Sequence, residues 1–138
     1  VISIETADAA RVYFVSAWTH PVGVVVLASA ALLHITLALR TTFVRRSLRM
    51  PAWQWTQFIL GIFIPLLLID HAMATGGGVL RVGLKPNYAY ELAVMWHFQP
   101  LKGWLQILLL VVAWSHASVG IHNWLRIKHW YATWQPHL

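Results

Sequence analysis

The chain has 138 residues, of which 59% are hydrophobic and only 10% are charged. Soluble domains carry about 25% charged residues, so this composition excludes an ordinary soluble domain and favours an integral membrane protein. The net charge of +6 does not indicate nucleic-acid binding, because the basic residues cluster beside apolar runs, where they set membrane topology. The absence of cysteine excludes disulfides, thiolate metal sites and thioether-linked haem.

The N-terminal part predicts a surface helix and a first membrane span. Residues 3–14 are amphipathic and too polar to cross a bilayer. Pro21 marks a boundary, because the residue before a proline is biased away from helix. Residues 21–40 form an apolar run close to the ~20 residues that a span needs. Arginines follow and place this end in the cytoplasm by the positive-inside rule: Arg40, Arg45, Arg46 and Arg49.

Two further spans are predicted over residues 53–75 and 101–125, and Pro65 should kink the first of these. Between them, residues 87–98 predict a second surface helix, on the outer face. The predicted fold class is all-α and integral to the membrane. Residues 1–138 would form a single multi-pass domain in the lipid bilayer, an antiparallel transmembrane helix bundle with its C-terminus in the cytoplasm.

Histidines inside the spans are the candidate site residues, because an ionisable group at bilayer depth usually marks function. His116 and Gly120 lie four residues apart on one helical face, so the glycine leaves room for a flat, bulky group such as haem b. His34 lies about 9 Å from the cytoplasmic edge of its span and His116 about 15 Å from it. Both histidines can therefore ligate one haem iron.

The other candidates lie at different depths. His71 is about 27 Å from the cytoplasmic edge, which predicts a second haem level, but no predicted span carries a second histidine there. The adjacent Asp70 is either an acceptor for a ligand histidine or an interfacial carboxylate. His122, rotated by about 120° from His116, suits a haem propionate or a quinone headgroup. For each histidine the alternative is a structural hydrogen bond to a neighbouring helix. No catalytic constellation is present in the sequence.

The residues around His116 also carry a resemblance. The pattern from Ser115 to His122 is similar to the haem-ligating segment of the cytochrome b subunit of succinate dehydrogenase, with His122 in place of that family's Arg. A longer likeness covers most of the chain and resembles the six-helix, cytochrome b-like membrane anchor of bacterial class III adenylate cyclases. Its main segments are Arg45 to Trp53, Leu60 to Leu67, Asp70-His71, Trp114 to Arg126 and Trp130-Tyr131.

This resemblance implies a domain in the bacterial inner membrane that holds two b haems and senses the respiratory quinone pool, as a homodimer. It implies that the chain is a piece of a longer protein, the second to fourth of six helices. The remaining helices, one of which would supply the partner of His71, and a cytoplasmic adenylate cyclase domain would belong to the parent chain.

Three functions stay open on the sequence. The first is a haem b redox receptor that regulates the cyclase domain. The second is an electron-transferring cytochrome b anchor subunit of a respiratory quinone oxidoreductase. The third is a haem-free membrane anchor or transporter segment, in which the histidines hydrogen-bond or relay protons. Ligation by two histidines leaves no open iron position, which suits electron transfer rather than oxygen chemistry.

Overall fold

The structure is a computed structural model, and it describes residues 3–45, 47, 49–73 and 87–131. These residues form helices and no strand, which confirms the all-α prediction. The chain divides into two compact units, Val1–Arg49 with Ala72–Pro100, and Met50–His71 with Leu101–Leu138.

Three helices are long and apolar enough to cross a membrane: α2 (Pro21–Val44), α3 (Ala52–Ala72) and α6 (Pro100–Leu125). They have 24, 21 and 26 residues, and about 20 residues suffice for a span at 1.5 Å of rise each. α2 continues one turn beyond the predicted end at residue 40 and ends at Val44. The last two residues of the predicted second span, 74 and 75, lie outside the described residues.

α1 (Ile4–Thr19) begins at a serine cap, where the Ser3 hydroxyl accepts the backbone N–H of Thr6 at 3.2 Å. It runs five residues beyond the predicted end at residue 14, because the apolar stretch that follows continues the helix up to the boundary set by Pro21. The tight turn into α2 requires Gly23, since a Cβ there would collide with the backbone of Ala17 and Trp18.

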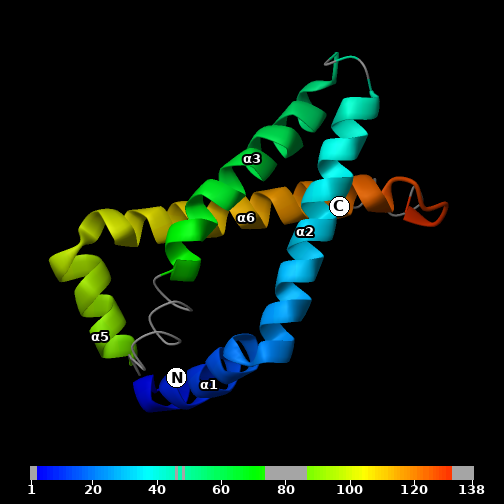
Figure 1. Cartoon of the computed structure of the whole chain (residues 1–138). Helices are drawn as coiled ribbons and strands as arrows, with labels where there is room; N and C mark the ends of the chain where they lie inside the picture. Colours follow the sequence, from blue (N-terminus) through cyan, green and yellow to red (C-terminus); the bar gives the residue numbers. More distant parts are fainter. Residues whose placement is uncertain (1–2, 46, 48, 74–86, 132–138) are drawn as a thin grey trace. The chain divides into compact units, whose positions relative to one another are not determined.

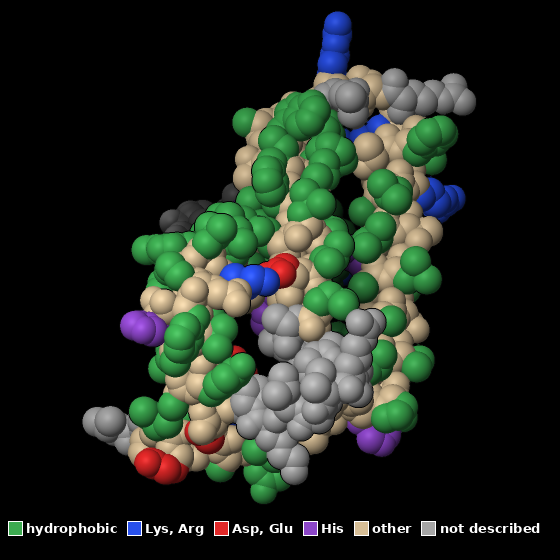
Figure 2. Space-filling view, turned by 60° about the vertical axis from the view of Figure 1, so that its left-hand side comes forward, with side chains coloured by type: hydrophobic (Ala, Val, Ile, Leu, Met, Phe, Trp, Pro, Cys, Tyr) green, Lys and Arg blue, Asp and Glu red, His purple; other side chains and the backbone are tan. Residues whose placement is uncertain are grey.

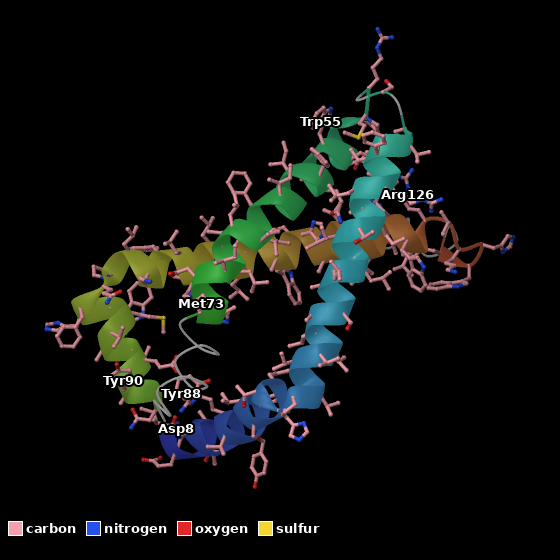
Figure 3. The ribbon with its side chains drawn as sticks, in the orientation of Figure 1. Asp8, Trp55, Met73, Tyr88, Tyr90 and Arg126 are labelled. Atoms are coloured by element: carbon pink, nitrogen blue, oxygen red, sulfur yellow. The ribbon has the colours of Figure 1, made fainter. Side chains whose placement is uncertain are left out.

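The first unit joins α1 to α5 (Tyr88–Ala93), which leads into a short π-helical stretch, η2 (Val94–Phe98). These two elements occupy the predicted second surface helix. Asp8 of α1 accepts the backbone N–H of Tyr88 at 2.9 Å, and the two residues lie side by side in Figure 3. Arg11 bonds the Glu91 carboxylate at 3.3 Å and lies 3.7 Å from Asp8. We call these contacts the α1–α5 clamp.

The second unit pairs α3 with α6, which cross in Figure 1. Residues early in α3 contact residues late in α6, and the reverse also holds: Gln57 contacts His116, and His71 contacts Gln106. We call one terminus of the pair the Asp70 end, where Asp70 and His71 meet Lys102 and Gln106. We call the other the Arg126 end, made of Trp53, His122, Trp124, Arg126, Lys128 and Tyr131.

Little of the apolar surface is covered by the described chain. Among its hydrophobic residues only Leu109, Val112 and Tyr131 are buried, and Figure 2 shows hydrophobic side chains over much of the visible helical surface. Helices that face lipid or further helices expose such side chains, because hydrocarbon solvates them as well as a protein core does. The three apolar helices and this exposed surface together indicate a membrane protein.

Candidate functional site

His116 lies partly buried in the middle of α6, against α3. Its Nδ1 is 3.2 Å from the backbone carbonyl oxygen of Gln57, and its Nε2 is 3.5 Å from the side-chain amide nitrogen of Gln57. A carbonyl can only accept, so this arrangement assigns the proton to Nδ1 and leaves the lone pair on Nε2, where the Gln57 amide donates to it at a long distance.

Two glycines allow this approach of α3 and α6. A Cβ on Gly61 would lie 3.1 Å from Cε1 of His116, and a Cβ on Gly120 would lie 3.0 Å from the Gln57 amide nitrogen. Both distances are tighter than ordinary van der Waals contact, so a larger residue at either position would displace its neighbour. The space beside Gly120, which the sequence predicts for a flat ligand, faces the Gln57 side chain.

Pro65 adds a further polar feature to this part of α3, which runs through the proline as one helix. Proline has no N–H, so the carbonyl of Gly61, four residues earlier, has no i+4 donor within the helix. The oxygen Oε1 of Gln57 is also buried and has no hydrogen-bond partner. A buried acceptor of this kind costs about 1–3 kcal/mol unless a donor reaches it.

These observations fit an axial haem ligand. Metal-ligating histidines commonly donate their other ring N–H to a carbonyl, which fixes the tautomer and the ring orientation, and His116 makes that bond to Gln57. No three His, Asp or Glu side chains of the described chain come together as a metal site. A haem site needs fewer protein ligands, because the porphyrin supplies the equatorial nitrogens and the protein supplies only the axial ligands.

His34 lies on α2, in the first unit, with an exposed side chain. His116 lies in the second unit. Their predicted pairing on one iron stays a prediction.

His71 and Asp70 occupy the Asp70 end and have separate partners. His71 Nδ1 lies 2.8 Å from the amide oxygen of Gln106 and donates to it. The Asp70 carboxylate accepts from Lys102 Nζ at 2.8 and 3.1 Å. Asp70 and His71 therefore diverge, as their adjacent positions on a helix require. The structure shows the Asp70 carboxylate paired with Lys102, and the two alternatives predicted for Asp70 stay predictions.

His122 lies at the Arg126 end and bonds a residue that sequence reasoning missed. Its Nδ1 is 2.9 Å from the hydroxyl of Tyr131, and the two rings meet edge to face with centroids 5.7 Å apart. Tyr131 is only 6% exposed. The sequence gives only a weak signal for Tyr131, because no pattern in it indicates that the chain turns back on α6 after Leu125.

Gln57, Lys102 and Gln106 were also missed. Each is a polar residue in an apolar helix, and Lys102 and Gln106 lie one turn apart on α6, which is the only sign of them in the sequence.

Comparison of the chain with protein-family models, with characterised proteins and with solved structures finds no match.

Proposed function

We propose that the chain is the membrane part of a haem b redox receptor that senses the respiratory quinone pool. The observation that carries the proposal is the hydrogen bond between His116 Nδ1 and the Gln57 carbonyl, within a helix apolar enough to cross a membrane. It leaves Nε2 as the nitrogen with the lone pair, which is what ligation of iron requires. Gly61 adds the space in which the His116 ring lies against α3.

In this proposal each chain residue has a defined part. His116 and His34 are the axial ligands of one haem b, and the Gln57 carbonyl holds the His116 ring and makes it more basic. His71 ligates a second haem together with a histidine from outside this chain, and Gln106 orients its ring through Nδ1. His122 contacts a propionate or a quinone headgroup. Bound haem would supply one-electron redox chemistry.

The wider context follows from the same proposal. The complete domain would be a six-helix antiparallel bundle with b-haem sites in the bacterial inner membrane, working as a homodimer. A change in haem charge would alter the packing of α3 and α6, and the cytoplasmic adenylate cyclase domain of the parent chain would respond to it. A parent gene that encodes a cyclase domain supports this receptor, whereas a soluble redox partner supports a respiratory anchor subunit.

The test is the haem content of the full membrane domain, measured by a pyridine haemochrome assay and a reduced-minus-oxidised spectrum. We expect b-type haem in the wild type. His116→Ala and His34→Ala should each remove the same haem and leave the haem that depends on His71 partly in place. His97→Ala, which removes an exposed histidine of η2, is the matched control and should retain both.

Two outcomes would overturn the proposal. A wild type without haem would leave a plain membrane anchor. Full haem content in His116→Ala would show that this histidine has a structural role only, satisfied by its bonds to Gln57.

A further inference from the structure

The Arg126 end holds two cations against indole rings. The guanidinium carbon of Arg126 lies 5.4 Å from the ring centroid of Trp53 on α3, and Lys128 Nζ lies 4.8 Å from the ring centroid of Trp124 on α6. An indole face attracts a cation through its quadrupole but carries no net charge. Both side chains are therefore positioned by their rings and keep their full positive charge.

Among the described residues of the second unit, no carboxylate pairs with these cations. The sequence has four acidic residues. Asp8 and Glu91 lie on α1 and α5, where they contact Arg11, and Glu5 lies near the start of α1. Asp70 pairs with Lys102 at the opposite end of the α3–α6 pair. Within the second unit no carboxylate balances Arg126 and Lys128, so their charge calls for an anion from outside this unit.

A turn after α6 fixes the two cations in place. The N–H of Lys128 bonds the Leu125 carbonyl at 2.8 Å, and the N–H of Tyr131 bonds the Lys128 carbonyl at 3.1 Å. The bond between Tyr131 and His122 then closes this turn onto α6. Around the cations, apolar side chains stay exposed: Trp124 57%, Ile127 76% and Trp130 56%.

We propose that the Arg126 end is a binding site for the headgroup phosphate of an anionic phospholipid. α6 ends at Leu125, so residues just beyond a span of this length lie at the headgroup level of the bilayer. There, Arg126 and Lys128 face the phosphate, while Trp124, Ile127 and Trp130 contact the glycerol backbone and upper acyl chains. The exposed apolar residues favour a lipid over free phosphate, since free phosphate would leave them uncovered.

The test compares lipids bound to the full chain by native mass spectrometry, after release from micelles that contain phosphatidylglycerol and phosphatidylcholine in equal amounts. We expect the wild type to retain phosphatidylglycerol in preference. The attraction of one cation to an anionic headgroup is about 1 kcal/mol, or about fivefold, so the loss of a cation that contacts the bound headgroup, in Arg126→Gln or Lys128→Gln, should lower the ratio about fivefold. Excess inorganic phosphate should not displace the lipid.

The controls distinguish a specific lipid site from the general attraction between basic residues and anionic lipid. Arg49→Gln removes the same charge from the arginine-rich segment that is predicted to lie on the same side of the membrane. It should leave the ratio nearly unchanged, and a loss equal to that of Arg126→Gln would overturn the site. Tyr131→Phe keeps every charge but removes the bond to His122, and we expect a lower ratio.

Three further outcomes would also overturn the proposal. These are equal retention of the two lipids by the wild type, an unchanged ratio in Tyr131→Phe, and displacement of the lipid by inorganic phosphate. Circular dichroism of each variant, including the two single glutamine variants, identifies those that keep wild-type helicity, and only their ratios are compared. The measurement does not depend on haem, so its result is independent of the proposed redox function.

Discussion

The two ends of the α3–α6 pair hold their cations by different means. At the Asp70 end, Lys102 is paired with a carboxylate, and the neighbouring His71 is paired with an amide. At the Arg126 end, Arg126 and Lys128 lie over indole rings instead. The first end is therefore electrically balanced within the chain, whereas the second keeps a net positive charge. An end of the first kind needs no external anion, and one of the second kind is built to face one.

The largest effect is expected at the contact between Gly61 and His116, midway between the two ends. Both ends depend on the close approach of α3 and α6 at this contact. Gly61→Val should push the His116 ring away from α3, because even a Cβ would lie 3.1 Å from Cε1. Overpacking of this kind costs about 1–3 kcal/mol. Thermal unfolding in detergent measures the loss, and the control Ile62→Val changes an exposed neighbour on α3. Stability equal to the wild type would show that the two ends hold the helices together without this contact.

A smaller effect should separate the two ends directly. A double-mutant cycle with Asp70→Asn and Lys102→Gln should give a coupling of about 0.2–1 kcal/mol, since both side chains are nearly half exposed, and it should shrink as salt is added. The matching cycle with Trp53→Leu and Arg126→Gln should give about 0.5–1 kcal/mol. We expect that coupling to depend less on salt, because an indole carries no net charge. Equal salt dependence of the two couplings would contradict the contrast between the ends.

The smallest effect is a dependence of stability on acid pH, and it concerns Glu5 on α1. The Arg126 end has no carboxylate that could titrate in this range. The hydrogen bond from the Ser3 side chain, with one from its own backbone, lowers the pKa of Glu5 from its ordinary value of 4.5. A folded-state pKa below the unfolded value stabilises the fold above pH 4.5, and this contribution is lost as the pH falls through the folded value.

Ser3→Ala should therefore reduce the helicity lost between neutral and acid pH, as followed by circular dichroism. Its loss of the helix cap does not depend on pH and so cancels in that difference. An unchanged pH dependence would mean that Ser3 does not act on the Glu5 carboxylate.

The sequence predicts the elements of this chain better than their contacts. Apolar runs and the boundary at Pro21 locate the three long helices, because each signal lies within a single segment. The partners of His116, His71 and His122 were not predicted, since periodicity shows the faces of one helix but not which faces meet. The predicted antiparallel order does not give the register that brings Gln57 to Gly120 and His71 to Gln106.

The α1–α5 clamp has a consequence for how often the chain crosses the bilayer. Asp8 and Tyr88 are 80 residues apart and directly bonded, so in a bilayer the segments just before α2 and just before α6 would lie on the same side. A chain that returns to the side from which it started must cross an even number of times in between. α2 and α3 are the two candidate spans between the clamp residues, so a topology in which only one of them crossed would pull the clamp apart.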